Sequence, residues 1–391
     1  MLQGRNATVS IQRVCRGSSV DSLSSTTRKA VLSDCGIFWQ LGGPEAANIR
    51  REPPTEVSAD VQVMKPQAES ESFGGNDPGS RYPGGCRFAF TILDDTDDAT
   101  VANVKPLYDL LFELGYRTTK TVWPVACPEG SRIYFAGHTL QEPGYAEFAR
   151  ELLERGFEVA FHGATMESSE RGRTLRALDI LRDELGVEPR IHCNHGQNRE
   201  NLYWGPNRYR AWPLRRAASI GRRLWGGQTY SGEVEKSRYF WGDICRARIR
   251  YVRSFAFATL NTASLPVHGP YRTRNTPYVN YWFTTSDAPD AAAFRNLVTR
   301  EAVDVLAESR GYCILSTHLG KGFVKNGQVD GTVADVLRYM AGLGGWFVPA
   351  SELLDHLMEQ HPPTELSPWR QFSLESAHVI DRLRSRARKS R

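Results

Sequence analysis

The sequence has 391 residues, of which 40% are hydrophobic and 24% are charged, and its formal net charge is +5. This composition is typical of an ordinary soluble globular protein with room for one large domain or two. The excess of positive charge is concentrated in segment 362–391, which has 7 basic and 3 acidic residues, whereas segment 82–361 has 33 basic and 32 acidic residues. The balanced central segment gives no reason to expect nucleic acid as a partner.

The cysteines argue against two further classes of protein. The sequence has seven of them, scattered and never spaced as Cys-x-x-Cys, which disfavours a disulfide framework and a cysteine zinc site and indicates a reducing compartment. No apolar run approaches the roughly 18 residues of a membrane span, and the N-terminus lacks the apolar core of a secretory signal. We therefore expect a cytoplasmic protein without a transmembrane segment.

The chain divides into three parts. Residues 1–81 show no sustained apolar period, and such a segment cannot bury enough surface to offset the entropy lost on ordering, so we predict a disordered leader. In 82–361 strand and helix signals alternate. The predicted strands cover 88–93, 117–125, 157–161, 190–193, 255–260, 278–284, 312–316 and 346–348. The predicted helices cover 101–114, 145–155, 169–185, 291–308, 333–341 and 352–358.

The alternation predicts the architecture. Strands that alternate with helices of this length pair in parallel, and seven or eight such units favour a closed barrel in one α/β domain. Segment 362–391 is assigned as a basic tail, and its final stretch RLRSRARKSR is interpreted as solvated or frayed, with an acidic surface as a weaker alternative partner.

Several predicted strands run into residues that carry chemistry. The first ends at Asp94 and Asp95, and three later ones lead to His162, to His192 and His195, and to His318. A barrel gathers the ends of its strands on one face, so these side chains should converge. A carboxylate and two imidazoles suffice to hold a catalytic divalent metal, and two ionisable groups would remain for base and acid work. Asp97 and Asp98, next to the first helix, are interpreted as capping residues.

These residues resemble the polysaccharide deacetylase, or NodB-homology, superfamily, and in particular its WbmS-like branch associated with bacterial surface-polysaccharide clusters. The similar segments are LDDTD, FHGAT, HCNHGQNRENLYWG, RYFWGD and LSTHLGKGF. The resemblance implies a distorted (β/α)7-type barrel that hydrolyses N- or O-linked acetyl groups on sugars with a divalent metal, for which zinc is the expected ion. It implies Asp95 and His162 as metal ligands, Asp94 as the base, and His318 as the catalytic acid.

One position departs from the family pattern. The second motif usually has another histidine four residues after the first, and here that position is Met166. A third metal ligand must then come from His192 or His195. We favour His195, because it lies past the end of its strand beside Gly196, where the backbone can turn the ring inward.

Segment 199–253 combines positive charge with aromatic residues. It holds 13 basic and 4 acidic residues interleaved with tyrosines and tryptophans. Aromatic faces suit sugar rings, and arginines suit carboxylate or phosphate. We therefore predict that Arg199, Tyr203, Trp204 and Trp241 bind a carbohydrate that is anionic or phosphate-linked. A partly buried insertion is the alternative, and nucleic acid is disfavoured because no recognition motif accompanies the charge.

The leading hypothesis is a metal-dependent hydrolase that removes an acetyl group from a sugar or a surface-polysaccharide precursor. Two alternatives stay open. One is a metal-free glycoside hydrolase that uses paired carboxylates from the cluster 94–98. The other is a degenerate barrel that binds sugar during polysaccharide assembly without turning it over. Metal content separates the first hypothesis from both alternatives.

Overall fold

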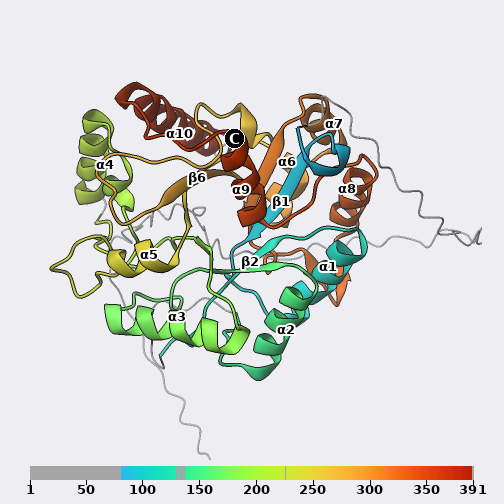
Figure 1. The fold of residues 1–391 in the computed structure, drawn as a ribbon, viewed down its shortest axis with the longest axis horizontal. Helices are drawn as coiled ribbons and strands as arrows, with labels where there is room; N and C mark the ends of the chain where they lie inside the picture. Colours follow the sequence, from blue (N-terminus) through green and yellow to red (C-terminus); the bar gives the residue numbers. More distant parts are fainter. Residues whose placement is uncertain (1–80, 129–130, 132–136, 225, 390–391) are drawn as a thin grey trace, which may run out of the picture.

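The computed structural model describes residues 81–128, 131, 137–224 and 226–389. At its centre is a closed barrel of seven parallel strands (Figure 1). The strands follow one another around the barrel in sequence order, and β7 pairs with β1 to close it. They are β1 (Ala89–Asp94), β2 (Thr119–Val122), β3 (Glu158–Phe161), β4 (Ile191–His192), β5 (Tyr251–Phe257), β6 (Tyr281–Asp287) and β7 (Tyr312–Thr317). The predicted distorted seven-stranded barrel is confirmed, and the predicted leader lies, apart from Arg81, outside the described residues.

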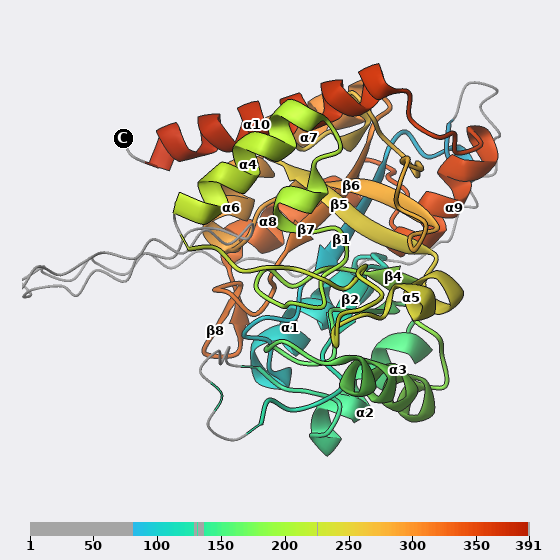
Figure 2. The same cartoon turned by 90° about the vertical axis from the view of Figure 1, so that its left-hand side faces the viewer.

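Helices surround the barrel (Figures 1 and 2). They are α1 (Val101–Glu113), α2 (Pro143–Glu154), α3 (Arg171–Leu185), α4 (Trp212–Leu224), α5 (Gly242–Arg248), α6 (Ala291–Leu297), α7 (Arg300–Glu308), α8 (Gly331–Ala341), α9 (Ala350–Gln360) and α10 (Pro368–Lys389). Short elements are the 3-10 turns η1 (Pro83–Gly85), η2 (Gly205–Arg208) and η3 (Thr262–Ser264), and a hairpin of β8 (Val324–Lys325) and β9 (Gln328–Val329). Among the described residues, no helix is both long enough and apolar enough to cross a membrane.

Successive residues of the strands feed two separate cores, because side chains alternate between the faces of a strand. Ala89 and Leu93 of β1 pack inside the barrel, together with Phe283 of β6 and Ile314 of β7, and α9 covers one end of this core. Phe90 and Ile92 instead join the core between the barrel and its helices. The same alternation determines which way the side chains at the end of β1 face. Asp95 continues the inward series of Leu93, whereas Asp94 continues the outward series of Ile92.

Two predicted elements differ from the structure. The single helix expected over 291–308 is two helices, because Thr299 caps a new one: its side chain accepts a hydrogen bond from the backbone N–H of Ala302 at 3.2 Å. The expected strand over 346–348 is a single bridge between Trp346 and Ala89. It therefore adds no eighth strand to the barrel.

Helix α10 occupies most of the segment that was predicted as a basic tail, and it extends to Lys389, within the stretch interpreted as solvated or frayed. Leu374, Glu375 and His378 of this helix are buried, and the helix contacts β5. Only one of these three side chains is apolar, so the buried face carries no hydrophobic period that the sequence could reveal.

Candidate metal and active site

Three side chains meet beyond the carboxyl ends of the strands: Asp97, His162 and His195. Nε2 of His162 lies 3.5 Å and Nε2 of His195 lies 3.7 Å from Oδ1 of Asp97, and one ligand atom from each residue lies within 4.8 Å of the others. All three side chains are buried. Oδ1 of Asp97 accepts no hydrogen bond from any described residue. A buried carboxylate oxygen without a donor, facing two imidazole nitrogens, fits a divalent cation.

Asp97 takes the place that the sequence analysis gives to Asp95. The interpretation of Asp97 and Asp98 as helix caps is wrong, because Thr100 and Asn103 cap α1 in a reciprocal pair of hydrogen bonds. Asp98 has a positive φ of 60°, which turns the chain just after Asp97. The carboxylate of Asp97 is thus free of any capping role and faces the histidines.

A buried network orients His195. Nδ1 of His195 lies 3.1 Å from Oδ1 of Asn198. The amide nitrogen of Asn198 donates to the carbonyl oxygen of Thr165 and to Oε1 of Glu200, both at 3.0 Å, so its oxygen must face the histidine. His195 therefore carries its proton on Nδ1 and directs the lone pair of Nε2 toward Asp97. Burial lowers the pKa of His195, which favours the neutral form that binds metals.

Glu200 anchors this network below the surface. Oε2 of Glu200 accepts a hydrogen bond of 2.9 Å from the backbone N–H of Ser169. Burial nevertheless raises the pKa of Glu200 to about 8, because desolvation outweighs the hydrogen bonds that favour the charged form. Asn198 and Glu200 were not predicted as site residues from the sequence, although both lie in the segment HCNHGQNREN.

Asp95 faces the barrel interior and pairs with Arg253 of β5. Nη1 of Arg253 lies 2.9 Å from Oδ1 and 2.8 Å from Oδ2 of Asp95, and Nδ1 of His162 lies 3.6 Å from Oδ1. Burial alone would raise the pKa of Asp95, but Arg253 and His162 outweigh it and hold the pKa below its usual range. Asp95 is therefore an ionised carboxylate next to the metal group. Arg253 was missed because the strand was predicted to begin at residue 255.

His318 approaches the same group from β7. Its Nδ1 lies 2.7 Å from the carbonyl oxygen of Pro289, which places the proton on Nδ1. Its Nε2 lies 3.4 Å from Oδ2 of Asp97, and Nζ of Lys321 lies at the same distance from that oxygen. Burial would raise the pKa of Asp97, but the three histidines outweigh it and keep the pKa well below its usual range.

Two candidate residues point the other way, into the barrel wall. Oδ2 of Asp94 accepts hydrogen bonds from Lys120 at 2.7 Å and from Tyr108 at 3.0 Å, and Oδ1 accepts one from the backbone N–H of Leu319 at 2.8 Å. His192 lies 3.1 Å from both the carbonyl oxygen of Phe161 and Oδ1 of Asn194, and burial lowers its pKa to about 3. The structure therefore does not bring Asp94, the predicted base, to the metal group.

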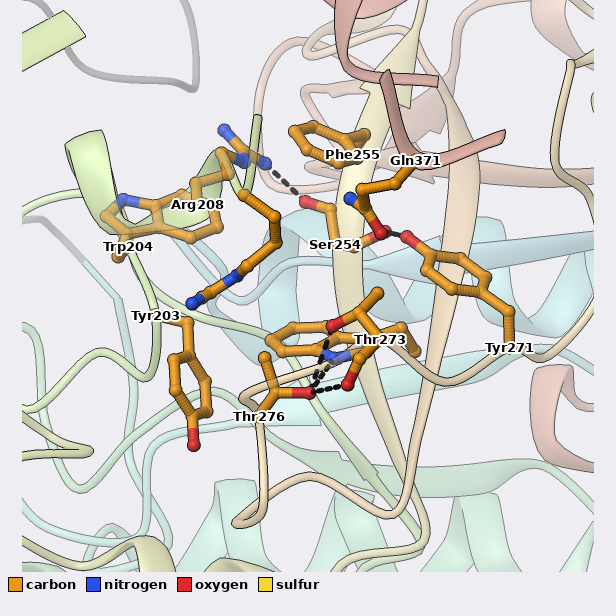
Figure 3. A pocket seen from close by; sticks show the side chains of 11 residues that line it. Tyr203, Trp204, Arg208, Ser254, Phe255, Tyr271, Thr273, Thr276 and Gln371 are labelled. Atoms are coloured by element: carbon orange, nitrogen blue, oxygen red, sulfur yellow. Dashed lines mark hydrogen bonds between the residues drawn. The ribbon is translucent and has the colours of Figure 1, made fainter. Parts of the chain in front are cut away.

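The four predicted carbohydrate-binding residues are not gathered at the metal group. Trp241 is fully buried, and its indole N–H donates to the carbonyl oxygen of Glu200 at 2.7 Å, so the prediction that it contacts a sugar is not supported. Arg199 is exposed. Tyr203 and Trp204 line a narrow hollow beside β5 and η2 (Figure 3). There the guanidinium of Arg208 lies 4.0 Å from the centre of the Trp204 ring.

Comparisons with known proteins follow the fold. No protein-family model matches the chain, and no curated protein matches it. One similar solved structure, named as a polysaccharide deacetylase from Mycobacterium smegmatis, has 14% identity and a TM-score of 0.41, and the match covers 73% of this chain and 96% of that one. Peptidoglycan deacetylase PdaC from Bacillus subtilis has 12% identity and a TM-score of 0.35, with 73% and 95% covered.

A third solved structure is WbmS from Bordetella bronchiseptica, named as a polysaccharide deacetylase involved in O-antigen biosynthesis. It has 12% identity and a TM-score of 0.32, with 71% of this chain and 93% of that one covered. These three solved structures are thus all named as polysaccharide or peptidoglycan deacetylases.

Proposed function

We propose that this protein is a divalent-metal-dependent hydrolase that removes an acetyl group, N- or O-linked, from a sugar or a surface-polysaccharide precursor. One observation carries the proposal. Asp97, His162 and His195 form a buried ligand set, and both Asp95 and His318 border it. A ligand set, an ionised carboxylate and an imidazole in one place are what the hydrolysis of an acyl group requires.

Each side chain has a role that its contacts suit. Asp97, His162 and His195 would hold the metal, and zinc suits a set of two imidazoles and one carboxylate. When bound, such a cation polarises an acyl carbonyl and lowers the pKa of water. Asp95, kept charged by Arg253, accepts the proton from the attacking water. His318, when both of its ring nitrogens are protonated, delivers the proton of Nε2 to the leaving amine or alcohol, because its Nδ1–H is already committed to Pro289.

The contacts of Asp94 remove it as one of the paired carboxylates of a metal-free glycosidase. That mechanism needs two carboxylates that face one substrate. Asp94 faces away from the barrel interior and already accepts hydrogen bonds from three donors. The cluster 94–98 therefore supplies no second carboxylate from Asp94 to pair with Asp95.

Two finer proposals accompany the main one. We propose that the substrate is anionic or phosphate-linked, which is supported by the exposed Arg199 and the excess of basic residues in 199–253. We also propose a cytoplasmic location, which is supported by the sequence pattern of the seven cysteines, scattered, odd in number and never spaced as Cys-x-x-Cys.

The test is acetate release from a panel of N- and O-acetylated oligosaccharides. We expect release by the zinc-loaded protein, loss of release after chelation, and recovery when zinc is added back. Chelation-resistant cleavage of glycosidic bonds would instead establish the glycosidase. Binding of an oligosaccharide without any release of acetate would establish a sugar-binding barrel.

A further inference from the structure

Exposed apolar side chains gather on two helices that the hydrolase proposal does not use. Ten large hydrophobic residues are exposed among the described residues, and seven of them belong to α4 and α10. They are Trp212, Ile220 and Leu224 on α4, and Trp369, Phe372, Ile380 and Leu383 on α10. Scattered exposed apolar residues are ordinary, but such a concentration on two elements marks an interaction surface.

The exposed residues of α10 form one stripe. Trp369, Phe372, Ile380 and Leu383 follow positions i, i+3, i+11 and i+14, which share one face of a helix. That face lies opposite the buried side chains of Leu374 and His378. Trp369 is 75% and Leu383 is 58% exposed. The helix thus packs on the barrel with a mainly polar face and presents its apolar face outward, the reverse of the usual arrangement.

Helix α4 lies beside α10 in both views of the fold (Figures 1 and 2). Its start is tied to α10, because the carboxylate of Glu375 accepts hydrogen bonds from the backbone N–H groups of Arg210 at 2.6 Å and Ala211 at 2.9 Å. No residue of α4 is buried, although the helix is amphipathic. Trp212 and Leu224 are 68% and 72% exposed.

The charge of these helices has one sign on the outside. Helix α4 carries Arg215, Arg216, Arg222 and Arg223 and no acidic residue, and Arg370 and Arg384 are exposed on α10. Within the described part of the chain, none of these six arginines forms a salt bridge. The two acidic residues of α10 face the barrel instead: Glu375 is buried, and Asp381 accepts a hydrogen bond of 3.2 Å from the backbone N–H of Ala258. We call the seven apolar residues and these six arginines the α4–α10 face.

We propose that the α4–α10 face binds an anionic lipid surface. Apolar side chains flanked by arginines are the pattern of helices that lie in the membrane interface, where the apolar residues enter the acyl boundary and the arginines meet the phosphates. Tryptophan suits this depth because its ring is apolar and its N–H is polar. A second copy of the chain is a poor occupant, because a two-fold interface would set arginines against arginines. The proposal is independent of the proposed hydrolase activity.

The experiment is co-sedimentation of the full chain with vesicles of phosphatidylcholine alone and with added phosphatidylglycerol. We expect sedimentation with the anionic vesicles only, weakened by added salt. The exposed changes Trp369→Ser, Phe372→Ser and Leu383→Ser, made together, should weaken binding by about tenfold or more, and so should replacing the four arginines of α4 by glutamine. Phe112→Ser, on α1 at the other side of the barrel, is the matched control and should bind like the unchanged chain.

Three outcomes would overturn the proposal. The chain could fail to sediment with anionic vesicles, or the two sets of variants could bind as well as the Phe112 control. Alternatively, light scattering could show a dimer that the triple variant abolishes, in which case the face joins two copies of the chain. Because every changed residue except the half-buried Arg222 is exposed, the circular dichroism spectra should be unchanged, and the binding data then report on the surface alone.

Discussion

Two sets of buried polar residues lie near the strand ends, one in the barrel wall and one inside the barrel. They differ in whether their polar atoms have hydrogen-bond partners. In the barrel wall, both oxygens of Asp94 accept hydrogen bonds of 3.0 Å or less. Inside the barrel, Oδ1 of Asp97 and Nδ1 of His162 have no hydrogen-bond partner among the described residues, and Asp97 meets the histidines at 3.4–3.7 Å. Buried polar groups are nearly always satisfied, so the first set fits a structural role, and the unsatisfied atoms of the second set fit the ligand site proposed above.

The largest effects are expected for a pair of matched variants, Asp97→Asn and Asp95→Asn. Asp97→Asn should lose stoichiometric metal and with it acetate release, because the anionic oxygen of the ligand set is gone. Asp95→Asn should keep the metal and lower turnover by on the order of 10²–10⁴, because only the base is removed. Elemental analysis and acetate release measure the two effects. Metal loss in the Asp95 variant alone would return the ligand role to Asp95.

His318→Asn tests whether His318 is the catalytic acid or a metal ligand. Turnover should fall by on the order of 10²–10⁴ while the metal is retained, because the side chain that delivers the proton is absent. The readouts are acetate release and metal content. If the variant lost its metal, His318 would be a fourth ligand, and if it kept full activity, the proposed acid would be wrong.

Lys120→Met tests whether the buried pair of Lys120 and Asp94 in the barrel wall stabilises the fold. It removes the partner of a fully buried carboxylate, so it should lower the free energy of unfolding by about 3–5 kcal/mol. The control is Lys105→Met, which breaks half-buried ion pairs with Asp109 and Glu151 and should cost about 1 kcal/mol or less. Urea unfolding measures both. Equal small losses would show that the Asp94 pair does not hold the fold.

Asn198→Ala and Asn194→Ala compare the supports of the two histidines. Asn198 contacts His195 in the metal group, whereas Asn194 contacts the outward His192. Asn198→Ala should weaken zinc affinity by about 10–100-fold, since a support of a metal-ligating histidine is lost. Asn194→Ala should leave the affinity nearly unchanged. Competition with a chromogenic chelator gives the affinities, and an equal loss in both variants would mean that neither asparagine acts through a specific ring.

A further prediction concerns the pH dependence of stability that Glu200 contributes. Its pKa is about 8 in the folded chain, against an unperturbed value of 4.5. The folded state therefore binds the proton more tightly than the unfolded state, so this stabilisation is complete below pH 4.5 and is lost as the pH rises through 8. Relative to the unchanged chain, Glu200→Gln should gain stability between those pH values. Parallel urea midpoints for the two proteins would contradict the shift.

The barrel could be predicted from the sequence, because most of its strands are short apolar runs that alternate with helical periods. The sequence also indicated His162, His195 and His318, since they stand at or after strand ends, and the structure places all three beside Asp97. The proposed function moves the role predicted for Asp94 to Asp95, and the role predicted for Asp95 to Asp97. The alternation along β1 indicates the first of these changes, because the inward Leu93 requires Asp94 to face outward and Asp95 to face inward.

Other parts of the site could not be found in this way. Asp97 lies beyond the strand, where no alternation applies and only the turn at Asp98 sets its direction. Arg253 lies on the same face of β5 as the inward Tyr251, but it was counted among the basic residues of 199–253 and not as part of a strand. Helix α10 was missed because its buried face includes Glu375 and His378, which a search for apolar periods passes over.

The most direct test of the central claim is a crystal structure of the zinc-loaded protein with anomalous scattering recorded at the zinc edge. We expect one strong peak at about 2.0–2.2 Å from Oδ1 of Asp97 and from Nε2 of both His162 and His195. A peak bonded to Asp95 or Asp94 in place of Asp97, or no peak among these residues, would contradict it.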